Sequence, residues 1–85
     1  MIPNPSPETI DSVIGIVALF TGPRRIDLRA SLRDDLGLDD IDRMAIGVEL
    51  SEAFGSDVRD KEIEDWDTIE DIARTVEAMN RSKAA

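Results

Sequence analysis

The sequence predicts an all-α fold, a bundle of three longer helices and one short helix with a long loop after the first. Apolar residues recur at helical spacing in three separate segments, and capping residues or glycines bound these segments. A strand-like alternation occurs only at Ile26 and Leu28. At 85 residues and 9.4 kDa, we expect one domain, 1–85, with flexible ends at 1–5 and 81–85.

The first helix is predicted over residues 7–21. Ser6 is typical of an N-cap and Pro7 of the first helical position, while Gly22 and Pro23 end the helix. An apolar stripe at helical spacing predicts its buried face. The stripe consists of Ile10, Val13, Ile14, Ile16, Val17, Leu19 and Phe20.

Residues 22–38 follow no single period. Ile26 and Leu28 alternate with polar residues, whereas Leu28, Leu32 and Leu36 are four apart, as in a short helix. We therefore predict a structured loop that its leucines hold to the core. A loop of this length is often functional.

The second helix is predicted to begin at Asp39 or Asp40, either of which can cap it, and to end at Gly55. Gly47 lies inside the helix at a cost of about 1 kcal/mol relative to Ala, which is typical of close packing against a neighbour. The helix has two apolar rows, more than one buried stripe needs. One row is Ile46, Leu50, Ala53 and Phe54, and the other is Ile41, Met44, Ala45 and Val48.

A short third helix is predicted over residues 60–65. Asp60 can cap it, and Ile63 and Trp66 are the apolar residues that can anchor it to the core. It connects the second helix to the last one.

The last helix is predicted to start at Asp67 or Thr68. Thr68 and Asp71 have the spacing of a capping box, in which each side chain accepts from the other's backbone N–H. The predicted buried face consists of Ile69, Ile72, Ala73, Val76 and Met79.

The chain is strongly acidic, with 10 basic and 19 acidic side chains and a formal charge of −9. Residues 39–71 hold 13 acidic and 3 basic side chains, so this segment accounts for the excess. Such a charge argues against nucleic acid and anionic membrane as partners. The segment is either a solvated helical face or a docking surface for a basic partner.

Cysteine and histidine are both missing from the sequence. No disulfide, thiolate nucleophile or thiolate metal site can therefore form, and the commonest general base is absent. No apolar run approaches the roughly 18 residues of a membrane span, and no signal-peptide pattern opens the chain. We expect a cytoplasmic protein that is not an enzyme.

The densest cluster of acids consists of Asp34, Asp35, Asp39, Asp40 and Asp42. A calcium loop of the EF-hand type beginning at Asp35 would need a glycine at its sixth position and a glutamate at its twelfth, and the chain has neither. Paired carboxylates can also serve general acid–base catalysis, but no nucleophile or histidine accompanies them. We expect helix capping and solubility rather than a metal or catalytic site.

The long loop also carries four arginines. They either bind an anion or balance the nearby carboxylates and the acidic helix, and we favour the second interpretation. The arginines are Arg24, Arg25, Arg29 and Arg33, and the loop carboxylates are Asp27, Asp34 and Asp35.

The segment 34–42, Asp-Asp-Leu-Gly-Leu-Asp-Asp-Ile-Asp, resembles the phosphopantetheine attachment motif of acyl carrier proteins. That motif reads acidic, leucine, glycine, any residue, aspartate, serine, leucine, aspartate. Residues 49–55 resemble the end of the family's second helix, and residues 66–72 resemble the start of its last helix. The resemblance covers residues 8–79 and implies a four-helix bundle of acyl-carrier type.

By this resemblance, the family's attachment serine falls on Asp40. In the family, that serine hydroxyl attacks coenzyme A in the active site of a transferase and then carries 4′-phosphopantetheine as a phosphodiester. A carboxylate cannot form such a stable linkage. Ser31 and Ser51 lie nine and eleven residues away, so we expect no cofactor on this chain. Either the chain is an engineered Ser→Asp variant, or it is a natural carrier-like protein that has lost its arm. The intact neighbours Asp39 and Asp42 slightly favour the first explanation.

The resemblance also implies partners. They would be acyl-transferring and synthase enzymes of lipid or polyketide biosynthesis that dock through basic patches, and a phosphopantetheinyl transferase for a serine-bearing form. We expect a monomer without nucleic-acid partners; the rival hypothesis is an acidic helical interaction module unrelated to acyl transfer. The implied docking residues are the acids Asp39, Asp42, Glu49 and Glu52 and the apolar residues Ile41, Met44, Ala45 and Val48.

Overall fold

The computed structural model describes residues 5–84, with side chains described as far as Asn80. Within this part the fold is all-α, as predicted, and contains no strand beyond an isolated bridge between Ser31 and Thr68. The predicted domain extent and the flexibility of residues 1–5 and 81–85 stay predictions, because residues 1–4 and 85 and the side chains of 81–84 lie outside the described part. The helices are α1 (Pro7–Thr21), α2 (Asp40–Phe54), α3 (Asp60–Asp65) and α4 (Ile69–Ala84).

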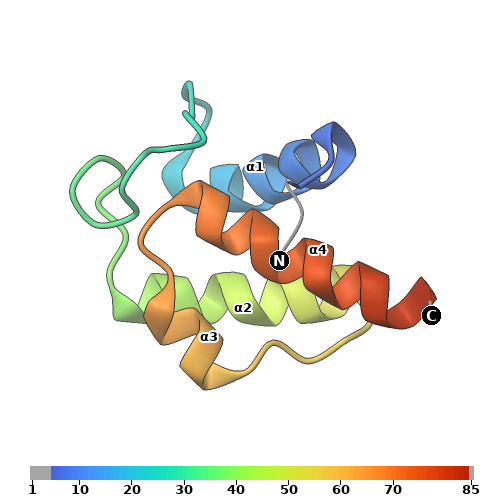
Figure 1. Cartoon of the computed structure of the whole chain (residues 1–85). Helices are drawn as coiled ribbons and strands as arrows, with labels where there is room; N and C mark the ends of the chain where they lie inside the picture. The colour runs from blue at the N-terminus through green and yellow to red at the C-terminus, as the bar shows by residue number, and fades with distance from the viewer. Residues whose placement is uncertain (1–4, 85) are drawn as a thin grey trace.

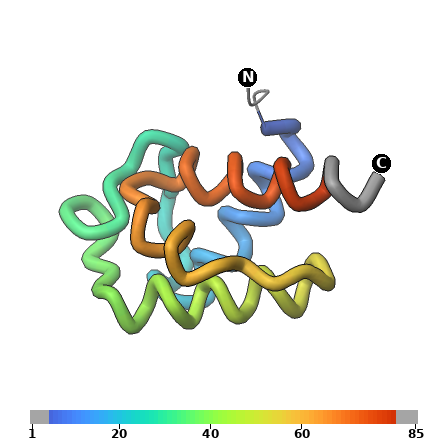
Figure 2. Tube along the Cα trace, turned by 60° about the horizontal axis from the view of Figure 1, so that its bottom comes forward, coloured from blue at the N-terminus to red at the C-terminus, as the bar shows by residue number. Residues whose placement is uncertain are grey.

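The three longer helices pack around one core, with α3 beside α2 (Figure 1). α1 runs in the opposite direction to α2 and α4 (Figure 1). The long loop, the start of α2 and the start of α4 all lie at one end of the molecule, as Figures 1 and 2 both show. This end therefore gathers three segments that are distant in the sequence.

The core is formed by apolar side chains from every helix and from the long loop. Burying each large side chain contributes about 1.5–3 kcal/mol relative to exposing it. The fully or nearly fully buried residues are Val13, Val17, Leu32, Leu36, Leu38, Ile46, Leu50, Ile63, Trp66, Ile69, Ile72, Ala73 and Val76. Met79, which we expected among them, is half-buried.

The long loop is structured, as predicted, and its leucines hold it to the core. Leu32 and Leu36 are 1% and 8% exposed. The backbone N–H of Leu32 donates to the Asp67 carbonyl at 2.8 Å, and that of Glu70 donates to the Leu28 carbonyl at 2.9 Å. The loop is thus fixed to the start of α4 by both packing and hydrogen bonds.

Capping residues bound the helices largely where the sequence predicts. Ser6 caps α1 by accepting from the backbone N–H of Thr9 at 3.2 Å. The capping box of Thr68 and Asp71 is present, with backbone-to-side-chain distances of 3.0 and 3.3 Å. Gly55 ends α2 in the left-handed conformation, with φ 67°, where glycine costs least.

Gly47 allows α3 to pack closely on α2, as predicted. A Cβ atom at this position would lie 2.5 Å from Cδ1 of Ile63. The glycine lowers the helix propensity of α2 but leaves room for Ile63, which is buried in the core and 4% exposed.

Three expectations for the helices are wrong. Leu19 is 71% exposed because it lies about 200° around α1 from the buried Val17. Ala53 is exposed although helical spacing places it on the same side of α2 as the fully buried Ile46. Asp60 is the first residue of α3 rather than its cap, which is Arg59 without a side-chain hydrogen bond.

Glu77 of α4 accepts from the backbone N–H of Ser6 at 2.7 Å and from the hydroxyl of Thr9 at 3.3 Å. We expect Glu77→Ala to lower the free energy of unfolding by about 1–3 kcal/mol, because the backbone N–H of Ser6 loses its acceptor and the Thr9 hydroxyl keeps only its contact with the Ser6 hydroxyl. Glu77→Gln keeps an acceptor oxygen and should lose less. Urea denaturation followed by circular dichroism measures both, and equal losses would contradict this role.

Candidate functional site

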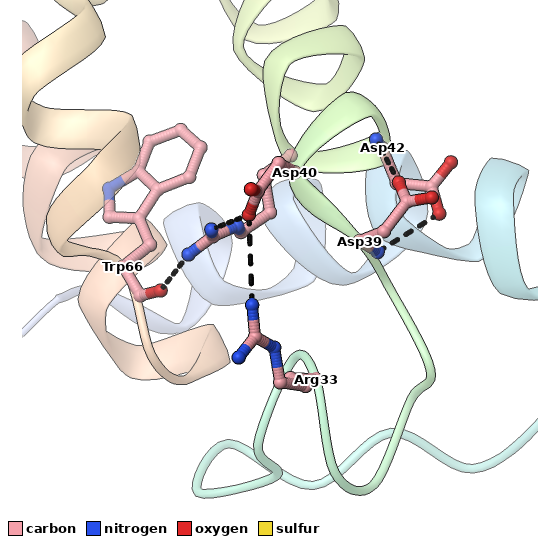
Figure 3. Close-up of polar contacts among 6 residues, drawn as sticks. Arg33, Asp39, Asp40, Asp42 and Trp66 are labelled. Atoms are coloured by element: carbon pink, nitrogen blue, oxygen red, sulfur yellow. Dashed lines mark hydrogen bonds and ion pairs between the residues drawn. The ribbon is translucent and has the colours of Figure 1, made fainter.

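The start of α2 is fixed by two aspartates in a reciprocal capping box. Asp39 accepts from the backbone N–H of Asp42 at 2.8 Å, and Asp42 accepts from that of Asp39 at 3.3 Å. Asp39 is therefore the cap, and Asp40 is the first helical residue, between the two. The Asp40 side chain is 75% exposed, so the capping box presents position 40 to the solvent (Figure 3).

Two arginines approach the carboxylate of Asp40 from different segments. Arg43, one turn along α2, donates a hydrogen bond to Oδ1, and Nη2 of Arg33 in the long loop lies 3.9 Å from the same oxygen (Figure 3). Arg43 also donates to the backbone carbonyl of Trp66 at 3.1 Å. The first turn of α2 is thus joined to the loop and to the corner between α3 and α4.

The second apolar row of α2 lies on the surface. Ile41, Met44 and Val48 are 78%, 41% and 55% exposed, whereas Ile46 and Leu50 of the first row are fully buried. Ala45 of the second row is half-buried. The excess apolar width of this helix therefore faces outward.

The acids of α2 surround this exposed apolar row in sequence. Asp39 and Glu52 are exposed, and Asp42 and Glu49 are half-buried. Acids beside an exposed apolar strip provide a hydrophobic contact with a charged rim. The predicted docking residues thus all lie on α2 or at its cap.

A hollow of about 380 Å³ lies between α2 and α3, next to the apolar row. Met44 and Val48 belong both to the row and to the lining of the hollow. The remaining lining residues are Gly47, Ser51, Glu52, Asp57, Val58 and Ile63. The exposed apolar surface of α2 therefore continues into a recess.

The two serines nearest to Asp40 in the sequence are engaged in local structure. The hydroxyl of Ser31 accepts from the backbone N–H of Asp34 at 3.0 Å. The hydroxyl of Ser51 donates to the Gly47 carbonyl at 2.9 Å and accepts from the Val58 N–H at 3.1 Å. Both serines are half-buried, and the oxygens of both hydroxyls already contact the backbone.

Three members of the aspartate cluster bind backbone N–H groups, which agrees with the expected capping role. Asp35 accepts from the N–H of Ser31 at 2.7 Å, and Asp39 and Asp42 form the capping box. In the part of the chain that the structure describes, no group of three or more acids is arranged to hold a metal ion.

The arginines of the loop only partly fit the prediction that they balance nearby acids. Arg33 approaches Asp40, and Arg24 donates to the backbone carbonyl of Asp35 at 3.3 Å. Among the described residues, Arg24, Arg25 and Arg29 form no ion pair. These three arginines line a hollow of about 290 Å³ together with the acids Asp27 and Asp35.

Sequence reasoning missed Arg43, whose side chain is only 19% exposed. The spacing of Asp40 and Arg43, three residues apart on a helix, is a signal for an ion pair that could have identified it. The hydrogen bond to the Trp66 carbonyl has no such signal, because it depends on how α3 and α4 are placed.

Comparisons with known proteins agree with the resemblance. A family model described as "Phosphopantetheine attachment site" matches residues 11–76, more than three quarters of the chain. The acyl carrier protein of Campylobacter hominis is 28% identical over 78 residues, a match that covers 89% of this chain and 99% of that protein. None of the helices in the described residues combines the length and apolar character that crossing a membrane requires.

Proposed function

This chain belongs to the family of phosphopantetheine attachment domains, which are carriers and not enzymes. We propose that it docks on acyl-transferring and synthase enzymes but cannot take the phosphopantetheine arm. The observation that carries this proposal is the exposed carboxylate of Asp40 beside an otherwise intact outward face of α2. We further propose that the chain acts as a monomer in the cytoplasm.

The outward face of α2 supports the docking half of the proposal. Ile41, Met44 and Val48 form an exposed apolar strip next to a recess, which is typical of a surface that a partner covers. The acids Asp39, Asp42, Glu49 and Glu52 favour a partner with a basic patch, which would approach faster and in a defined orientation.

The chemistry of position 40 supports the second half. A carboxylate that attacks phosphorus forms an acyl phosphate, a mixed anhydride that water cleaves, rather than a lasting phosphodiester. Ser31 and Ser51, the neighbouring serines, are held by hydrogen bonds. The residues present therefore do not fit 4′-phosphopantetheine as a resident group, and the role that remains is binding to carrier-dependent enzymes.

The alternative function is an acidic module that binds a basic partner unrelated to acyl transfer. It would use the same face of α2, so the surface alone does not separate the two. The family membership favours carrier-dependent enzymes as the partners.

We expect Val48→Glu to weaken binding to a carrier-dependent acyltransferase or synthase by at least about tenfold, because a charge replaces an apolar contact at the centre of the face. Isothermal titration calorimetry on the folded chain and on its Asp40→Ser form measures this. Leu19→Glu is the matched control, since Leu19 is also an exposed apolar residue but lies on α1.

The control should bind like the parent chain. Equal losses for Leu19→Glu and Val48→Glu would place the contact elsewhere. If no carrier-dependent enzyme binds either the parent chain or its Asp40→Ser form, the acyl-transfer proposal fails and the alternative module gains support.

A further inference from the structure

Arg43 carries a charge that is largely withdrawn from water. Its side chain is 19% exposed, which is low for an arginine. Nη1 donates to the Trp66 carbonyl at 3.1 Å, and this bond orients the guanidinium so that Nη2 faces the start of α2. A guanidinium keeps its charge at any ordinary pH, so one that is largely withdrawn from water favours an anion beside it.

Asp40 supplies that anion. Its Oδ1 accepts from Nη2 of Arg43, and Nη2 of Arg33 lies 3.9 Å from the same oxygen (Figure 3). Among the described residues, Asp40 is the only acid that pairs with either arginine. Two cations from the loop and from α2 therefore converge on one carboxylate oxygen.

We infer that Arg33 and Arg43 form an anion site for a phosphate group, and that the carboxylate of Asp40 fills this site from within the chain. The inference rests on the proposed function, since it takes position 40 as the family's attachment position. The oxygens of a phosphate on a serine hydroxyl lie one bond farther from Cβ than those of Asp40. Arg33 has an exposed side chain that can move, so it can follow such oxygens and close its 3.9 Å separation.

Two guanidiniums suit a phosphate group because their donors match its several oxygens. When side chain 40 is uncharged, the same pair should take free orthophosphate. In the chain as it stands, the carboxylate of Asp40 provides at the start of α2 the negative charge that the phosphodiester provides in a carrier with the phosphopantetheine arm.

Orthophosphate titrated into the Asp40→Ser chain at constant ionic strength tests the site. The readouts are the fluorescence of Trp66, the single tryptophan, whose carbonyl Arg43 contacts, and the NMR signal of the Arg43 Nε–H. We expect saturable binding that is at least about tenfold tighter than in the parent chain, where Asp40 competes for the site.

Asp60→Ser is the matched control. Asp60 is also the first residue of a helix, but it forms no ion pair among the described residues. The control should bind orthophosphate no better than the parent chain, and a similar affinity of Asp60→Ser and Asp40→Ser would overturn the inference. Absence of saturable binding to Asp40→Ser would overturn it as well.

Adding Arg43→Gln to Asp40→Ser should abolish the binding, and adding Arg33→Gln should weaken it. Arg33 is 77% exposed, so its variant keeps the test decisive if the Arg43 variant fails to fold. An Arg33→Gln chain that binds as tightly as Asp40→Ser alone would remove Arg33 from the site. Binding to carrier-dependent enzymes uses a different readout, so failure of the anion site is distinguishable from failure of the proposed docking.

Discussion

Asp40→Ser is expected to gain one phosphopantetheine when incubated with coenzyme A and a phosphopantetheinyl transferase, while the parent chain keeps its mass. Position 40 is the first residue of α2 and its side chain is 75% exposed, so a hydroxyl there is accessible to a transferase. The motif around it keeps the family's acidic residue, leucine, glycine and both aspartates, with Ile41 in place of the second leucine. Intact-protein mass spectrometry measures the gain as an all-or-none change.

The variant should stay folded, which makes the result interpretable. Asp39, not Asp40, is the N-cap, so the capping box survives the change. Loss of the Asp40 charge at the helix start costs about 0.3–1 kcal/mol. Its ion pairs add little, because the carboxylate is mostly exposed.

Asp39→Ser is the control for position. Serine can also cap a helix, so this variant places a hydroxyl one residue away while leaving Asp40 in place. It should gain no mass. A gain on Asp39→Ser or on the parent chain would show that another residue is the acceptor and would overturn the assignment of position 40.

The helix boundaries could be predicted because caps are local. Ser6 and Gly22 bound α1, and Gly55 ends α2, through contacts within one or two turns. The long loop follows no single hydrophobic period because its conformation depends on contacts with residues that are distant in the sequence. Leu32, for example, donates its N–H to Asp67 of the segment that leads into α4.

In the candidate site, too, local spacing predicts some features, whereas others depend on tertiary packing. The exposure of Ile41, Met44 and Val48 follows from helical spacing once the opposite row is buried. Arg43 was missed because half of its environment is the Trp66 carbonyl, which only the packing of α3 and α4 brings near. Leu19 shows the opposite error, since its spacing suited the core and no element covers it.

Trp66→Ala is expected to cause the largest loss of stability of any change proposed, about 3–5 kcal/mol of unfolding free energy. Trp66 is 2% exposed, and its removal would leave a cavity where α3 meets α4. Natural domains have about 0.05–0.15 kcal/mol per residue in total, so a chain of 85 residues would lose much of its stability. Urea denaturation followed by circular dichroism measures the change without relying on tryptophan fluorescence.

Trp66→Phe and Thr75→Val separate packing from hydrogen bonding. The indole N–H of Trp66 donates to the Thr75 hydroxyl at 2.9 Å. Trp66→Phe keeps most of the ring and loses this bond, whereas Thr75→Val leaves the buried N–H without its acceptor, at about 1–3 kcal/mol. If Trp66→Ala costs no more than Trp66→Phe, the hydrogen bond rather than the cavity dominates.

The same series links the core to the start of α2. Arg43 is oriented by the backbone carbonyl of residue 66, not by the indole ring. Trp66→Phe should therefore keep the NMR signal of the Arg43 Nε–H near its parent position, while Trp66→Ala should shift it even under conditions where the chain is still folded. An unchanged signal in Trp66→Ala would mean that the Arg43–Asp40 pair does not depend on the packing of α3 against α4.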